Sequence, residues 1–143
     1  MLRRNIIQLA AVVGLFAVGA APLATADAKE KEGIVIQVSD DNPKTWTQAL
    51  NVIRNIQNAR GKDNVQIELV VFGLGAGMLK ADSTLANRVD DTLASGADVL
   101  MCENTMRGFK LEKQDMHPKI GYVPGGIIQI LERQKQGWAI VRP

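Results

Sequence analysis

Short apolar runs rich in β-branched residues alternate in this chain with segments whose apolar residues recur at helical spacing. The strand-like runs are GIVIQVS (33–39), NVQIELVVFG (64–73), ADVLMCEN (97–104) and WAIVRP (138–143). Helical patterns follow over 43–60, 85–94, about 105–111 and about 126–136. Because short loops join the two kinds of segment, the alternation predicts βαβ units. We therefore predict an α/β fold, a three-layer α/β/α sandwich with a mostly parallel sheet of about five strands.

The apolar stripe of each predicted helix is expected to face the sheet. The residues expected to point inward are Trp46, Ala49, Leu50, Ile53 and Ile56 in the first helix, Leu85, Val89 and Leu93 in the second, and Ile127, Ile128 and Leu131 in the last. Trp138, at the start of the last strand, is expected to pack in the same way.

The first residues have the pattern of a targeting segment. Arg3 and Arg4 precede an apolar run from Leu9 to Leu23, which gives way to the small and charged stretch ATADAKEKEG. This pattern predicts a secretory signal peptide over 1–28 and one α/β domain over 29–143, exported to the periplasm or secreted. An uncleaved N-terminal anchor is the alternative, although the run is shorter than the about 20 apolar residues of a membrane span.

Composition narrows the classes of partner and cofactor. The formal net charge is only +2, and basic residues are scattered, so we expect no nucleic-acid partner and no membrane association after cleavage. With one cysteine and one histidine, the chain has no metal-ligand spacing, and we predict no metal and no cofactor. His117, beside a proline in DMHPK, is expected to be a surface loop residue.

Cys102 is the principal candidate for chemistry. It ends a predicted strand, and ligands of open parallel sheets bind at that edge. Asn104 or Thr105 is expected to start a helix, whose dipole would favour the thiolate, and Arg107 would add positive charge. A buried, inert thiol is the plain alternative, because free cysteine is among the most buried residue types. An intermolecular disulfide in a redox sensor is a further one.

A glycine-rich connection follows the second strand. The backbone amides of Gly73, Gly75 and Gly77, with Lys80, form a weak candidate anion site, although the pattern is neither a dinucleotide fingerprint nor a P-loop. A tight turn alone is the favoured explanation, because glycines so often serve turn geometry.

Four stretches together resemble the DsrE/DsrF-like family of small α/β proteins. They are GIVIQVSDDNPKTWTQALNVIRNI, VVFGLGAGMLKADS, VLMCENTMRGFKL and GIIQILERQKQGWAIVRP, which run from about Gly33 to Pro143. The most specific pieces are the element formed by Cys102, Asn104, Thr105 and Met106 and the ending RQKQGWAIVRP.

The resemblance implies a function as well as a fold. It implies a parallel-sheet sandwich that assembles into homo-oligomers, often trimers or hexamers. In sulfur-relay members, a cysteine at the end of the corresponding strand carries persulfide sulfur between partner proteins, and only Cys102 matches it here. We therefore expect an exported thiol or persulfide sulfur carrier that uses Cys102, supported by Asn104 and Arg107, with a thiol or persulfide partner protein. The alternative is a non-catalytic oligomeric scaffold or small-ligand-binding module in which Cys102 is structural.

Overall fold

The computed structural model describes residues 30–143, and the expected signal peptide at 1–28 lies outside them. The strands are β1 (Glu32–Val38), β2 (Val65–Val71), β3 (Asp98–Cys102), β4 (Gly121–Val123) and β5 (Ala139–Val141). The α-helices are α1 (Pro43–Arg60), α2 (Ala86–Ala94), α3 (Glu103–Gly108) and α4 (Gly126–Lys135). Short 3₁₀ helices cover Lys62–Asn64 (η1), Gly73–Leu79 (η2) and Lys113–Asp115 (η3). In the described residues, no helix is long and apolar enough to cross a membrane.

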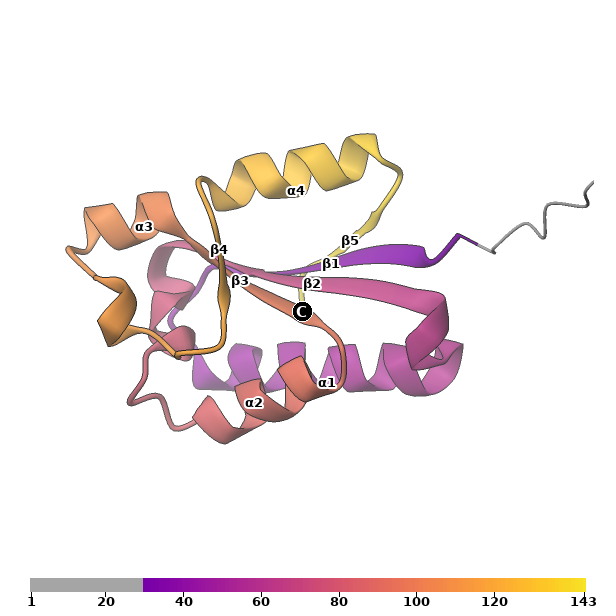
Figure 1. Cartoon of the computed structure of the whole chain (residues 1–143), viewed down its shortest axis with the longest axis horizontal. Coiled ribbons are helices and arrows are strands. Elements are labelled where there is room, and N and C mark those ends of the chain that lie inside the picture. The colour runs from indigo at the N-terminus through magenta and orange to yellow at the C-terminus, as the bar shows by residue number, and fades with distance from the viewer. Residues whose placement is uncertain (1–29) are drawn as a thin grey trace, which may run out of the picture.

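The five strands form one sheet in the order β4-β3-β2-β1-β5, and every neighbouring pair is parallel. Helices α1 and α2 cover one face of the sheet, and α4 covers the other (Figure 1). This arrangement confirms the predicted three-layer α/β sandwich. All parallel strands end at the same edge of the sheet, where loops from several strands meet.

The face under α1 and α2 holds the larger part of the hydrophobic core. Leu69, Val71 and Met101 of the sheet are completely buried there, and Ile53 of α1 packs into the same cluster. Trp46 is buried as predicted, and its indole N–H donates to the backbone oxygen of Asp40. This face therefore holds the sheet in place through burial of apolar side chains.

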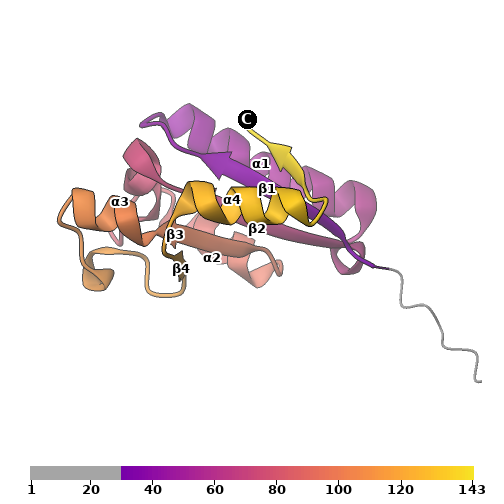
Figure 2. The ribbon, with the colours of Figure 1, turned by 90° about the horizontal axis from the view of Figure 1, so that it is seen from above.

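The opposite face has a much smaller core. Val35, Val70 and Ile130 are buried there, with Trp138 packed against them. The predicted inward stripe of α4 is wrong, because Ile127, Ile128 and Leu131 are 49%, 61% and 46% exposed. Instead α4 turns Gly126, Gln129, Ile130 and Arg133 toward the sheet, along which it lies lengthwise (Figure 2).

Two element boundaries also differ from the prediction. The segment Gly121–Val123, for which no strand was predicted, is the edge strand β4 and pairs with β3. Helix α3 begins at Glu103, and its N-cap is Cys102 itself rather than Asn104 or Thr105. The thiol thus belongs to the N-cap residue itself, two or three positions closer to the helix start than expected.

Candidate functional site

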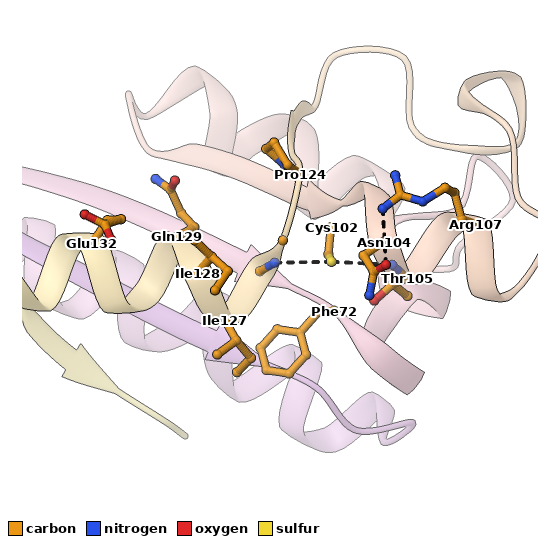
Figure 3. A pocket seen from close by; sticks show the side chains of 12 residues that line it. Phe72, Cys102, Asn104, Thr105, Arg107, Pro124, Ile127, Ile128, Gln129 and Glu132 are labelled. Atoms are coloured by element: carbon orange, nitrogen blue, oxygen red, sulfur yellow. Dashed lines mark hydrogen bonds between the residues drawn. The ribbon is translucent and has the colours of Figure 1, made fainter.

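A cavity of about 490 Å³ opens at the carboxyl ends of β2, β3 and β4, between the first turns of α3 and α4. Its apolar side is formed by Phe72, Pro124, Ile127 and Ile128, and its polar side by Asn104, Thr105, Arg107, Gln129 and Glu132. Cys102 and the Gly125–Gly126 backbone complete the lining. Figure 3 shows Cys102 between the two helix starts, with Glu132 and Arg107 at opposite ends.

The thiol of Cys102 receives two backbone hydrogen bonds. The amide of Thr105 in α3 donates to Sγ at 3.4 Å, and the amide of Gly126 in α4 donates at 3.2 Å (Figure 3). Only 4% of the residue is exposed, yet it lines the cavity. Sulfur therefore lies where the positive ends of two helix dipoles meet, which favours a negative charge on it.

Two opposing effects act on the acidity of this thiol. Burial raises the pKa of Cys102, whereas hydrogen bonds from the side chain and amide of Thr105 and from the amides of Gly126 and Asn104 lower it. The hydrogen bonds prevail, so the pKa of Cys102 lies below its ordinary value. The thiolate is the nucleophilic form, and the site increases its share.

Thr105 connects the glycine-rich segment to this site. Its hydroxyl oxygen accepts a hydrogen bond of 2.9 Å from the amide of Gly73, while its own amide donates to Cys102. The loop after β2 is thereby fixed against the first turn of α3.

The two predicted supporting residues do lie beside Cys102. Asn104 and Arg107 both line the cavity, and the guanidinium of Arg107 donates to Oδ1 of Asn104 at 3.1 Å. Among the described residues, no carboxylate lies within ion-pairing distance of Arg107. Its positive charge is thus available at the cavity edge.

The candidate anion-binding residues do not gather in the cavity. Gly73 and Gly75 donate their amides to Thr105 and to the backbone oxygen of Phe72. Gly75 packs so closely on Val38 that a Cβ would lie 2.9 Å from its backbone oxygen, and Gly77 lies against Trp46. Lys80 borders a separate depression. The structure gives these glycines packing and turn roles and brings none of them to the cavity.

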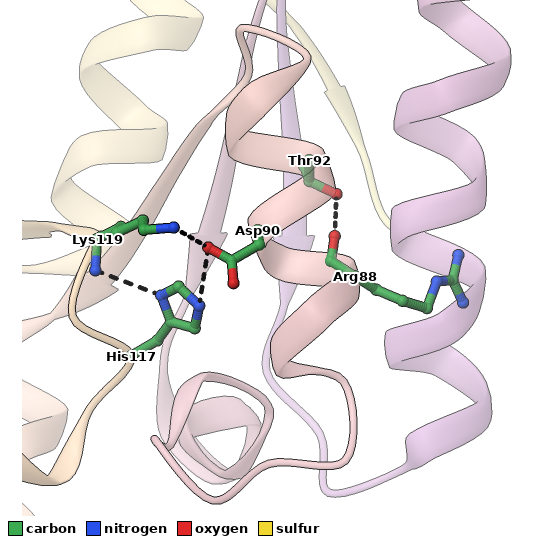
Figure 4. Close-up of polar contacts among 5 residues, drawn as sticks. All are labelled: Arg88, Asp90, Thr92, His117 and Lys119. Carbon is green, nitrogen blue, oxygen red and sulfur yellow. Dashed lines mark hydrogen bonds and ion pairs between the residues drawn. The ribbon is translucent and has the colours of Figure 1, made fainter.

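The prediction of a surface position for His117 is wrong. His117 is 3% exposed, with Nε2 3.6 Å from Asp90 of α2 and Nδ1 accepting from the amide of Lys119 (Figure 4). Lys119 Nζ lies 2.7 Å from the same carboxylate. The hydrogen bond from Lys119 is the main reason why the pKa of Asp90 lies below its ordinary value. This cluster joins the segment before β4 to α2, and the Cys102 cavity does not include it.

Helix α4 contributes to the site in a way that its sequence pattern did not predict. Gly126 supplies an amide to the thiol, and Gln129 and Glu132 of the same helix line the cavity; Phe72, which follows β2, was also not predicted there. The signal was the pair Gly125–Gly126 after Pro124, where a backbone can approach another group closely. Within residues 30–143, no group of three or more His, Cys, Asp or Glu side chains is placed to hold a metal ion.

Comparison with known proteins finds likeness in structure rather than in sequence. No protein-family model matches the chain, and no curated protein matches it. The solved structure of MTH1491 from Methanobacterium thermoautotrophicum, a protein of unknown function, has a TM-score of 0.75 and 26% identity, covering 79% of this chain and all of that one. BT1422 from Bacteroides thetaiotaomicron, also of unknown function, has a TM-score of 0.63 and 17% identity, covering 78% and 95%.

The ychN protein of E. coli has a TM-score of 0.62 and 10% identity, covering 80% of this chain and 99% of that one. These three are DsrE/DsrF-like fold proteins. The chain therefore has the DsrE/DsrF-like α/β fold, as the sequence resemblance implied.

Proposed function

We propose that this protein is a thiol or persulfide sulfur carrier in which Cys102 accepts and releases sulfane sulfur. One observation carries the proposal: Cys102 Sγ lies at the base of a cavity and accepts hydrogen bonds from the first turns of two helices. The lowered pKa of Cys102 and its position in the DsrE/DsrF-like fold support the same role.

The proposed reaction transfers one sulfur atom from a donor persulfide to Cys102 and then from Cys102 to an acceptor thiolate. The thiolate of Cys102 attacks the outer sulfur of a donor persulfide R–S–S–H, where R is a small organic group or a partner protein. The donor S–S bond breaks, R–S⁻ leaves, and Cys102 carries –S–S–H. An acceptor thiolate then attacks that outer sulfur, and the thiolate of Cys102 leaves. A thiol of low pKa suits both steps, because it is ionised for attack and leaves readily.

The supporting residues have defined tasks in this scheme. The amides of Thr105 and Gly126 stabilise the thiolate at the start and end of each cycle. Arg107, held by Asn104 at the cavity edge, attracts an anionic donor and stabilises its departing thiolate.

Mass spectrometry tests the function directly. After incubation with an organic persulfide, the wild-type Cys102 peptide is expected to gain the mass of one sulfur, which a second thiol then removes. Cys102→Ser should gain none. The rate of alkylation of the wild type should have a midpoint below the ordinary thiol pKa of about 8.5. An ordinary midpoint, or no transferable sulfur on Cys102, would refute the carrier role.

The cavity itself favours a second candidate, a small-ligand-binding module. Its volume of about 490 Å³ and apolar side fit the usual range of pockets that take organic ligands. Equilibrium binding of small organic thiols and their thioether analogues separates the two functions. A binding module keeps its affinity in Cys102→Ser and transfers no sulfur, whereas a carrier needs the thiol for transfer.

We further propose that residues 1–28 direct export and that the mature chain acts as a homo-oligomer. The basis is the targeting pattern around Arg3, Arg4 and Leu9–Leu23 and the family resemblance. N-terminal sequencing of the protein from a periplasmic or secreted fraction should begin near residue 29. A full-length N-terminus in the cytoplasmic fraction would contradict export.

A further inference from the structure

A buried carboxylate lies beneath α4, on the face of the sheet that carries the smaller core. Glu68 of β2 is only 2% exposed. Its Oε1 accepts from Nε of Arg133 at 2.9 Å and from Nη2 of the same guanidinium, and its Oε2 accepts from Nε2 of Gln129 at 2.8 Å. Hydrogen bonding to Glu68 raises the pKa of Arg133. A buried carboxylate requires such partners, and here both come from one helix.

These bonds are a large part of what attaches α4 to the sheet. Ile130 is its only buried large apolar residue, because Ile127, Ile128 and Leu131 face outward. At its C-terminal end, Arg133 also stacks 4.4 Å from the ring of Trp138. The position of α4 therefore depends on directional contacts to Glu68 as well as on apolar burial.

The same helix carries a donor to the candidate nucleophile. Gly126 is the first residue of α4, and its amide lies 3.2 Å from Cys102 Sγ. Gly126 also packs against Phe72, and an added Cβ would lie 3.0 Å from that side chain, so the helix start has little room to shift. Because a helix moves as a rigid unit, contacts at Gln129 and Arg133 determine where the Gly126 amide points.

We propose that Glu68 is a positioning residue for Cys102: by binding Gln129 and Arg133, it holds α4 so that the Gly126 amide donates to the thiolate. The proposal deepens the proposed function and rests on it, since it concerns the thiolate that attacks the donor. Glu68 itself does not line the cavity, so it acts only through the helix.

The test measures the rate of alkylation of Cys102 by iodoacetamide against pH in the native protein. The midpoint of the profile reports the thiol pKa, whereas the plateau at high pH reports accessibility, so loss of structure and loss of a hydrogen bond are separated. Glu68→Leu should move the midpoint upward and lower the rate at neutral pH by roughly threefold. The charged groups nearest the thiol are Arg107 and Glu132 in the cavity lining and Glu103 next to Cys102 in the chain, and they are the same in every variant.

Two substitutions at Gly126 test whether Glu68 acts on Cys102 through the Gly126 amide. Gly126→Pro removes the amide donor, and proline fits the first helical position after Gly125, whose φ of −147° and ψ of 120° are extended. Gly126→Ala keeps the amide and adds the same Cβ against Phe72. The proline Cδ also takes the place of the amide hydrogen beside Sγ, so the alkylation plateau of Gly126→Pro must show that the thiol stays accessible. Relative to Gly126→Ala, Gly126→Pro should lower the neutral-pH rate by roughly tenfold. In a double variant with Gly126→Ala, Glu68→Leu should still raise the alkylation midpoint. In a double variant with Gly126→Pro, Glu68→Leu should leave the midpoint unchanged.

Further variants keep the test valid if Glu68→Leu does not fold. Arg133→Lys retains the positive charge but loses the two-nitrogen contact, and it should move the midpoint in the same direction by less. Lys135→Ala breaks an exposed ion pair with Glu132 on the same helix and should leave the midpoint unchanged.

The outcomes separate this proposal from the proposed function. A low wild-type midpoint that neither Glu68→Leu nor Arg133→Lys moves overturns the positioning role and leaves the carrier role standing. If Glu68→Leu shifts the midpoint as much in the Gly126→Pro variant as in the Gly126→Ala variant, Glu68 does not act through the Gly126 amide. An ordinary wild-type midpoint overturns the carrier role itself.

Discussion

The acidity of Cys102 depends on groups that lie far apart in the sequence. Thr105 belongs to α3, Gly126 to α4 and Gly73 to the segment after β2, yet hydrogen bonds join all three to the thiol or to each other. The hydrogen bonds that lower the pKa of Cys102 come from Thr105 and from backbone amides, and the reactivity proposed for this thiol rests on them. Among single residues, Thr105 connects the thiol to the glycine-rich segment, because it forms hydrogen bonds with both.

Removing the hydroxyl of Thr105 should therefore have two effects. Thr105→Val leaves the partly buried Gly73 amide without its acceptor, which costs about 1–3 kcal/mol of unfolding free energy. It also removes the side-chain contribution that lowers the pKa of Cys102, so that pKa should rise. Urea unfolding and the pH profile of alkylation measure the two effects. Thr105→Ser keeps the hydroxyl as the matched control, and an equal loss in that variant would contradict the explanation.

At the scale of elements, the sequence predicted best what depends on unbroken apolar runs. β1, β2 and β3 were recognised because their residues are buried by helices or neighbouring strands along most of their length. β4 was missed because its three residues begin with a glycine and are followed at once by Pro124 and Gly125, whereas the equally short β5 lies in the longer apolar run WAIV. These errors concern the edge of the sheet, whereas the layer order needed only the alternation of strands and helices.

The error in α4 has a different cause. Its apolar stripe favoured Ile127, Ile128 and Leu131 as the inward face, but Glu68 lies beneath the helix, and a buried carboxylate requires a cation. Arg133 therefore faces inward together with Ile130, and Ile127, Ile128 and Leu131 face outward. The acidic residue inside the run QIELVV was the available signal, and its partner on another element could not be read from local periodicity. The same limit hid the Gly126 amide at Cys102.

Between α2 and the segment before β4, Asp90 provides a pH-dependent contact with Lys119 and His117. The pKa of Asp90 is lowered in the folded chain, chiefly by the hydrogen bond from Lys119. Its stabilising effect is therefore present above the unfolded pKa of about 3.9 and is lost as the pH falls through the lower folded value. Asp90→Asn should reduce stability at neutral pH and flatten the fall of stability below pH about 4.

Urea unfolding from pH 2 to pH 7 measures the effect, with Asp91→Asn as the control. Asp91 is the next residue of α2 and makes no ion pair within the described part of the chain. If the free energy of unfolding falls equally steeply with decreasing pH in the wild type and in Asp90→Asn, the contact does not stabilise the fold.

At the scale of the whole molecule, the face around the cavity is notably apolar. Ile127, Ile128 and Leu131 lie exposed on one short helix beside the cavity opening. Exposed apolar groups gathered on one face are typical of interaction surfaces, and the homo-oligomer proposed above would place a second copy of this chain on it. A homo-oligomer built on α4 would cover these side chains and narrow access to Cys102.

A charge placed on this face should therefore break the assembly. Ile128→Asp should sediment as a monomer under conditions in which the wild-type chain forms a trimer or hexamer, because an unpaired carboxylate is costly in an apolar interface. Leu74→Asp is the control, since Leu74 and Ile128 are both 61% exposed but lie on different elements. Neither substitution should alter the fold of a single chain. A wild-type monomer, or equal dissociation in both variants, would contradict assembly through α4. If the expected difference appears, the alkylation plateau of Cys102 should rise in Ile128→Asp alone, because the cavity then opens to solvent.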